Sequence, residues 1–225
     1  FHRMGIGVPF YFGGESDAHN PNDVIAKVYA SGLGMPDRDY YVKTEDRFKE
    51  ARAKYLAHVA AIFRLTGESN TRAKAEADTV LRMETKLAEA SLDNVALRDP
   101  KATDHKTTFA DIQKMTPHFP WAAYYKAANV TAGDLNVAEP KFLAEFDRQL
   151  ASTPIADWKV YLQWHLANAA ASSLSDPFVQ EDWEFNGKFL SGAKEMKPRW
   201  KRCVESTDRQ LGEALHVRLA DGREA

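Results

Sequence analysis

The stretch of sequence that decides the fold reads Gly32-Leu33-Gly34-Met35-Pro36-Asp37-Arg38-Asp39-Tyr40-Tyr41. Its two glycines widen the allowed backbone torsions, and Pro36 then fixes one of them. Arg38 lies between two aspartates, so we expect a buried guanidinium that holds backbone carbonyls or a carboxylate; an exposed run of charges is the alternative. Tyr40 and Tyr41 carry rings that favour burial and hydroxyls that need partners. A loop with this many constrained residues is more than a connector.

The composition is that of a folded domain with a sizeable core. The 225 residues allow one large domain or two small ones, and 44% of them are hydrophobic. A formal net charge of -2 gives no long-range attraction to nucleic acid, which we exclude as a partner. No apolar run approaches the ~20 residues of a membrane helix. The chain starts at Phe1 rather than at Met, so we expect processing or a longer parent protein.

Apolar residues recur at helical spacing along most of the chain, which predicts a mainly α fold. The expected helices cover residues 23–31, 45–66, 71–91, 108–115, 119–128, 139–151 and 154–174, with a last helix from Pro198 to about Ala214. Thr153 should cap the helix at 154–174, with Pro154 in its first turn. Phe10 to Phe12 could form a strand or an extended plug, but no strand alternation of useful length is present.

Glu84 stands in the middle of the apolar stripe of the 71–91 helix. An unpaired buried carboxylate is costly, so we expect a partner, and Arg98 a little downstream is our candidate. A solvated position at the edge of the stripe is the alternative. His165 lies on the aromatic face of the 154–174 helix, where we expect a core histidine that donates to a carbonyl.

The chain offers no complete metal site at the level of sequence. It contains no His-Glu dipeptide, and therefore no His-Glu-x-x-His zinc helix. The single Glu-x-x-His, from Glu213 to His216, lacks the second such pair that a di-metal bundle needs. Cys203 is the one cysteine, and we expect an inert side chain.

Several segments stand in an order that points to a known family. They are Pro9-Phe10-Tyr11-Phe12, the loop from Gly32 to Tyr41, Met83-Glu84-Thr85-Lys86-Leu87-Ala88 with Arg98-Asp99, Phe119-Pro120-Trp121, Trp158 to Trp164, and Pro198-Arg199-Trp200-Lys201-Arg202-Cys203-Val204. Together they resemble the N-terminal domain of the neprilysin and endothelin-converting-enzyme family of zinc metallopeptidases, in a bacterial style. The residues that carry the structural motifs are Gly32, Gly34, Pro36, Arg38, Tyr40, Tyr41, Glu84, Arg98, Trp158, Trp164, Arg199 and Trp200.

This resemblance implies a fold with two mainly helical lobes around a central cavity. Residues 1–215 would form the irregular multi-helix cap domain of such a two-lobed, gluzincin-type metallopeptidase. Residues 216–225 do not match the family pattern, and we expect a disordered or truncated tail there. In the parent protein the other lobe would carry zinc. No catalytic or zinc-binding residue can be transferred to this chain, because those motifs are absent from it.

The function implied is that of a non-catalytic part of a zinc metalloendopeptidase that hydrolyses small peptides. This part would cap the active-site cavity and restrict access to it. Its partners would be the missing catalytic lobe and, in the full-length protein, peptide substrates; the family's usual location is periplasmic or extracellular. The alternative is a free-standing helical binding or scaffold protein without enzymatic activity, whose aromatic residues line a ligand pocket.

Overall fold

The computed structural model describes residues 1–131 and 133–220, with side chains through residue 214. The chain divides into two compact units, unit 1 from Phe1 to Asp182 and unit 2 from Trp183 to Ala225. Most of the described residues are helical, as the sequence predicts. Within the described residues, no helix is both long enough and apolar enough to cross a membrane.

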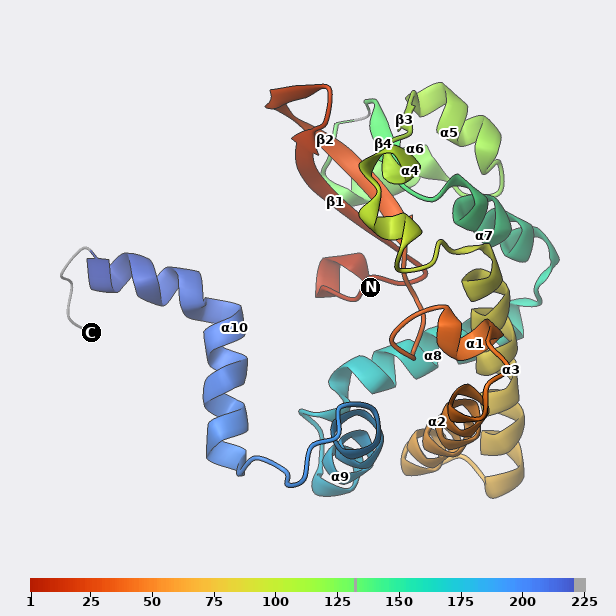
Figure 1. Ribbon diagram of the computed structural model, residues 1–225, viewed down its shortest axis with the longest axis vertical. Coiled ribbons are helices and arrows are strands. Elements are labelled where there is room, and N and C mark those ends of the chain that lie inside the picture. The colour runs from red at the N-terminus through yellow and green to blue at the C-terminus, as the bar shows by residue number, and fades with distance from the viewer. Residues whose placement is uncertain (132, 221–225) are drawn as a thin grey trace. The chain divides into compact units, whose positions relative to one another are not determined.

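Unit 1 is built around two long antiparallel helices, α2 (Asp46–Leu65) and α3 (Asn70–Ala90), which lie side by side in Figure 1. The predicted helices at 45–66 and 71–91 are thus confirmed. Ser69 caps α3, because its hydroxyl accepts a hydrogen bond from the backbone N–H of Arg72. The remaining helices of unit 1 are η1 (His2–Met4), α1 (Asp39–Val42), η2 (Ala96–Arg98), α4 (Pro100–Thr103), α5 (Phe109–Met115), α6 (Trp121–Ala128), α7 (Pro140–Ser152), α8 (Ile155–Ala171) and α9 (Asp176–Asp182).

The start of α8 differs from the prediction at its cap. The helix runs over the expected residues, but its N-cap is Pro154, and no side chain bonds the free amides there. Thr153 instead ends α7, where its backbone N–H donates to the carbonyl of Gln149. The short link between two helices therefore uses the threonine as the end of the first helix and not as the start of the second.

A four-stranded sheet, in the order β1-β2-β4-β3, replaces the helix predicted at 23–31. Its strands are β1 (Phe10–Asp17), β2 (Asn20–Ala30), β3 (Lys106–Thr107) and β4 (Leu135–Val137). β1 and β2 pair as an antiparallel hairpin, in which the rings of Tyr11 and Tyr29 stack at 4.5 Å. β2 then pairs with β4 in parallel. The hairpin pairing with β1 and the long-range pairing with β4, with β-branched residues such as Val24 and Val28, outweigh the helix-start signal of Asn20-Pro21-Asn22-Asp23.

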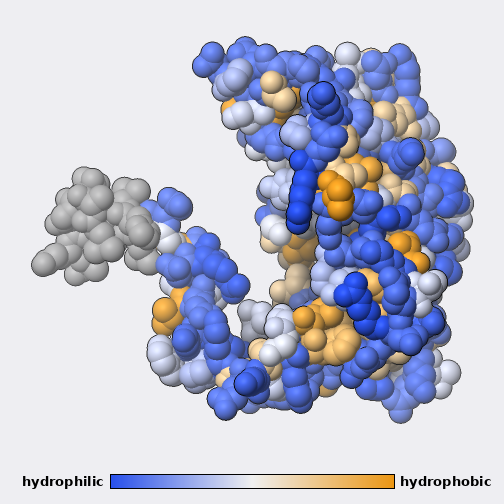
Figure 2. All heavy atoms as spheres, in the orientation of Figure 1, coloured by the Kyte–Doolittle hydropathy of each residue, from blue (hydrophilic) through white to orange (hydrophobic). Residues whose placement is uncertain are grey.

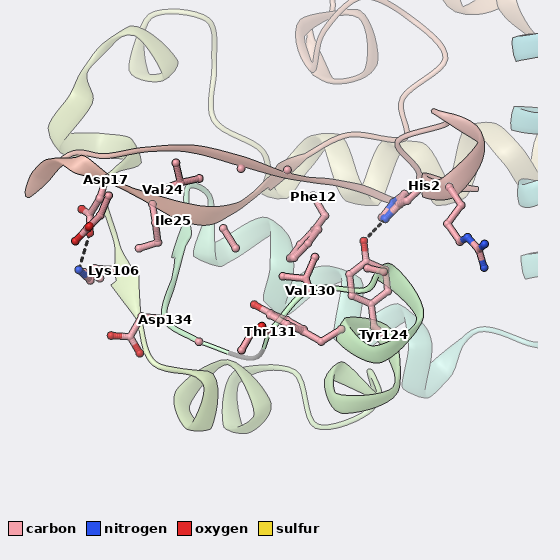
Figure 3. A pocket seen from close by; sticks show the side chains of 18 residues that line it. His2, Phe12, Asp17, Val24, Ile25, Lys106, Tyr124, Val130, Thr131 and Asp134 are labelled. Atoms are coloured by element: carbon pink, nitrogen blue, oxygen red, sulfur yellow. Dashed lines mark hydrogen bonds and ion pairs between the residues drawn. The ribbon is translucent and has the colours of Figure 1, made fainter.

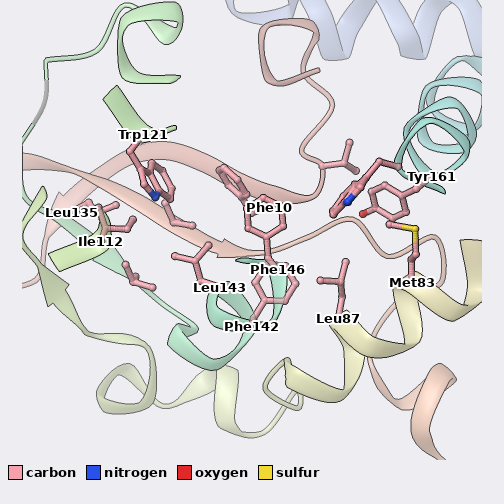
Figure 4. Close-up of a cluster of buried hydrophobic side chains, with 14 of the residues drawn as sticks. Phe10, Met83, Leu87, Ile112, Trp121, Leu135, Phe142, Leu143, Phe146 and Tyr161 are labelled. Atoms are coloured by element: carbon pink, nitrogen blue, oxygen red, sulfur yellow. The ribbon is translucent and has the colours of Figure 1, made fainter. Parts of the chain in front are cut away.

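The main core lies between this sheet and the helices that cover it (Figure 4). Phe10 of β1 faces Phe146 of α7, with ring centroids 5.4 Å apart, and Trp121 of α6 lies against Phe10 at 5.6 Å. Met83 and Leu87 carry the same cluster along α3, and Tyr161 extends it onto α8. The core therefore joins the sheet to the helices that hold the Gly32–Tyr41 loop.

Unit 2 contains η3 (Trp183–Leu190), a π-helix, and α10 (Arg199–Ala220). Trp200, Val204 and Leu211 are 68%, 59% and 53% exposed, and their spacing places them on one face of α10. Figure 2 shows apolar side chains among hydrophilic ones on this helix. The predicted tail at 216–225 begins inside the last turns of α10, and its side chains lie outside the described residues, so that boundary stays a prediction.

Candidate functional site

The side chains singled out from the sequence converge most closely around Glu84, on the inward face of α3. This carboxylate is fully buried. Its Oε2 accepts hydrogen bonds from the hydroxyls of Tyr41, at 2.8 Å, and Tyr55, at 2.7 Å. Its Oε1 lies 3.0 Å from Nε2 of His165 on α8. Glu84 is therefore buried and paired, as expected, and its partners come from α1, α2 and α8.

The partner predicted for Glu84 is wrong. Arg98 is exposed in η2, beyond the end of α3. The chain leaves α3 at Ser91 and runs over the surface of the unit, whereas Glu84 points into the packed interface with α2 and α8. A short distance in sequence thus does not bring the two side chains together.

Burial keeps the tyrosines of this cluster protonated. Desolvation raises the pKa of Tyr41 and of Tyr55 well above the usual value, and the negative charge of Glu84 raises both pKa values further. Each hydroxyl therefore stays a donor to the carboxylate. The Tyr41 hydroxyl also accepts a hydrogen bond from the backbone N–H of Met35, at 2.9 Å. One buried carboxylate thereby fixes the middle of the Gly32–Tyr41 loop through a tyrosine.

His165 has a different role from the one expected. It faces a carboxylate rather than a carbonyl, and its ring packs against Tyr161 with centroids 4.4 Å apart. Nε2 of His165 and Oε1 of Glu84 are in contact, but their alignment completes no hydrogen bond. The contact is therefore an electrostatic one whose strength depends on the charge of the imidazole.

The two glycines of the loop allow tyrosine side chains to approach the backbone. The hydroxyl of Tyr161 donates to the carbonyl of Gly32, at 2.7 Å, and Gly32 has a left-handed φ of 76°. A Cβ on Gly34 would collide with the hydroxyl of Tyr55 and would lie 2.7 Å from its Cζ. Both positions therefore require glycine because of the tyrosines that anchor the loop.

We expect Gly32→Ala to destabilise the protein by about 2–3 kcal/mol, since it adds backbone strain to a steric clash. The new Cβ would meet the Tyr161 hydroxyl and would lie 3.0 Å from Cα of Pro9. Gly67→Ala is the matched control, because Gly67 also has a positive φ, of 103°, but has open space around it. Urea denaturation should show a clearly smaller loss for the control; equal losses would mean that the clash is absent.

Arg38 holds the start of the loop against the end of α3. Its Nε donates to the carbonyl of Ala88, at 3.3 Å, and its side chain is half-buried. The expected contact with a backbone carbonyl is present. Asp37 accepts from the backbone of Asp39 and from the side chain of Asn94. The Asp-Arg-Asp run is thus an anchoring segment of the loop and not a free run of charges.

The other motif residues fall into three groups. Trp158 and Trp164 are buried on α8, and Tyr40 packs its ring against Phe48 of α2. Pro36 is exposed on the loop. Arg199 and Trp200 are exposed at the start of α10, in unit 2. Sequence reasoning missed Tyr55 and Tyr161 as anchors, although both lie within helices that it predicted, at 45–66 and 154–174.

The chemistry of this site is structural. Glu84 is fully buried, so neither substrate nor bulk water reaches it. Among the described residues, no three His, Cys, Asp or Glu side chains gather closely enough to hold a metal ion. The arrangement can fix the loop between α2, α3 and α8.

Comparison with known proteins gives one consistent result. Residues 1–220 match the N-terminal model of peptidase family M13. The chain is 29% identical to endothelin-converting enzyme 1 of Rattus norvegicus over 208 residues, which cover 89% of this chain and 27% of that enzyme. It is 26% identical to neprilysin-3 of Drosophila melanogaster, over 90% of this chain and 27% of that protein.

Solved structures agree with this. The zinc metalloprotease Zmp1 of Mycobacterium tuberculosis, in complex with an inhibitor, superposes with a TM-score of 0.92 at 31% identity. That match covers 99% of this chain and 34% of Zmp1. PepO from Lactobacillus rhamnosis shares the fold, with a TM-score of 0.71 at 18% identity over 86% of this chain and 31% of PepO. The chain thus spans about a third or less of the length of the proteins that it matches.

Proposed function

Because the chain belongs to peptidase family M13, we propose that it is the non-catalytic, N-terminal helical cap of a zinc metallopeptidase that cleaves small peptides. The observation that carries this proposal is the match to Zmp1, which takes in 99% of this chain but only 34% of that metalloprotease. In the proposal, the remaining part of the protein supplies the zinc-binding lobe. The role of this chain is to close over the cavity and limit the size of the peptides that enter.

The residues of this chain do not fit a zinc site, which supports assigning the metal to the other lobe. The sequence lacks the His-Glu-x-x-His helix, and the described residues hold no cluster of three metal-ligating side chains. No catalytic step is therefore assigned to this chain.

The exposed apolar row on α10 supports the proposed contact with a catalytic lobe. Trp200, Val204 and Leu211 are exposed and form an apolar row along one face of this helix, and exposed apolar patches often mark interaction surfaces. Burying such a row against a second lobe is the usual way in which a helix of this kind is stabilised. We propose that this face of α10 belongs to the interface between the two lobes.

A chimera tests the proposal. Residues 1–215 of this chain would replace the matching N-terminal third of Zmp1, and hydrolysis of an internally quenched short peptide would be followed by fluorescence. We expect hydrolysis that a chelator abolishes, and no cleavage of a large folded protein. The isolated chain should be inactive on the same peptide.

The chimera that also carries Gly32→Ala is the matched control. Because its cap has a distorted loop, this variant should hydrolyse the short peptide more slowly or begin to cleave the large folded protein. Chelator-sensitive hydrolysis by the isolated chain would contradict the proposal, because the chain would then carry a site of its own. A well-folded chimera with no activity would favour the alternative of a free-standing binding protein.

A further inference from the structure

A pocket of about 810 Å³ lies beside the β1–β2 hairpin, away from the Glu84 cluster (Figure 3). Its walls come from η1, the hairpin, α6 and residues 130–131 and 133–134, with Lys106 of β3 at one end. Its volume is within the range of sites for small ligands. Phe12 comes from the Pro9–Phe12 family motif, and the other described residues that line the pocket lie outside those motifs.

One end of the pocket is acidic. Asp17 is buried, and its carboxylate accepts a hydrogen bond from Nζ of Lys106, at 2.7 Å. That hydrogen bond raises the pKa of Lys106, and the charges of Asp134 and Asp23 raise it further. Lys106 and Arg3 also line the pocket, but Asp17 is already paired with Lys106, and the carboxylates of Asp23 and Asp134 leave a negative charge near this end that favours a second cation.

The middle of the pocket is apolar. Phe12 and Ile25 line it from the hairpin, and Val130 lines it from the opposite side. The ring of Phe12 is edge-to-face with that of Tyr124, at 5.1 Å, and with that of Tyr125, at 5.4 Å. This part of the pocket fits a large apolar side chain. At the other end, a hydrogen bond joins His2 to the hydroxyl of Tyr124.

Tyr125, which also lines the pocket, carries a polar group that the fold leaves unsatisfied. The residue is 2% exposed, and its hydroxyl has no hydrogen-bond partner in the structure. Burial raises the pKa of this hydroxyl, so it keeps its proton as a donor. An unpaired buried hydroxyl is costly, but this oxygen is closed off from solvent, so it takes no part in ligand binding.

We propose that this pocket binds a short peptide segment in which a basic side chain stands next to a large apolar one. The basic group lies against Asp134 and Asp23, and the apolar side chain lies against Phe12 and Ile25. The choice of a peptide rests on the proposed function. In that function the pocket is a binding site separate from the catalytic lobe, and it favours cationic, apolar substrates.

Isothermal titration of the 225-residue chain tests this with acetyl-Lys-Phe-Ala-amide and its matched partner acetyl-Glu-Phe-Ala-amide. We expect the lysine peptide to bind about fivefold tighter or more, and Asp134→Asn to remove most of that difference. Asp78→Asn, at an exposed carboxylate on α3, should change the affinity for neither peptide.

Equal binding of the two peptides, or unchanged binding by Asp134→Asn, would overturn the inference. Spermidine that binds as tightly as the lysine peptide would also overturn it, since the pocket would then recognise charge alone. The outcome is separable from that of the chimera: an active chimera without peptide binding refutes only the pocket, and binding with an inactive chimera refutes only the proposed function.

Discussion

Glu84→Ala is expected to lower the free energy of unfolding by about 3–5 kcal/mol, because it removes the common partner of a buried polar cluster. The hydroxyls of Tyr41 and Tyr55 lose their acceptor, and His165 loses the carboxylate that it faces. All of these groups are buried, so water cannot replace the lost partner without opening the interface. Urea denaturation followed by circular dichroism measures the loss.

Glu84→Gln separates charge from hydrogen bonding. The amide keeps an oxygen that accepts from the tyrosines and keeps the volume of the side chain, but it removes the negative charge beside His165. The loss in free energy of unfolding for Glu84→Gln should therefore be smaller than the loss for Glu84→Ala but larger than zero. A loss below about 1 kcal/mol for Glu84→Ala would contradict the structure, because removing a buried carboxylate leaves its two hydroxyl donors without an acceptor.

The long helices were predictable because their signals are local. α2 and α3 carry apolar stripes over some five turns each, with a short link and a serine cap between them, and the sequence indicates both correctly. The segment at β2 has a helix-start signal at its beginning but gains its structure from β1, its hairpin partner, and from β4, which is distant in sequence. Strand pairing of this kind is decided by tertiary contacts, and a local reading of residues 20–30 cannot supply them.

In the candidate site, too, local sequence signals predict some features, whereas others depend on tertiary packing. That Glu84 would be buried and paired followed from its place in an apolar stripe. Its partners did not follow, because Tyr41, Tyr55 and His165 belong to three other helices whose packing angles no periodicity gives. The requirement for glycine at position 34 likewise depends on the position of the Tyr55 hydroxyl in the folded protein. The unsatisfied hydroxyl of Tyr125 has no sequence signal, since it is a property of the finished fold.

Trp164→Ala should cost about 3–5 kcal/mol, which is the range for removing a large aromatic side chain from a core. Trp164 is fully buried, and its ring lies 5.7 Å from that of Tyr55 and 5.5 Å from that of His58. It thus packs α8 against α2 directly beside the Glu84 cluster. The truncation leaves a cavity that this rigid, polar neighbourhood fills poorly, so we expect the upper part of the range. Thermal and urea unfolding should agree on the loss.

Trp200→Ala provides the matched control, because both tryptophans belong to the family motifs but differ in environment. Trp200 is 68% exposed on α10, and its truncation should change the free energy of unfolding by no more than about 0.5 kcal/mol. In the chimera with the catalytic part of Zmp1, Trp200→Ala should have the larger effect on the packing of the two lobes against each other. The Trp200 ring would be buried there, so its truncation should weaken that contact. A large loss for Trp200→Ala in the isolated chain would mean that α10 already buries this face, which would remove it as the proposed contact with the other lobe.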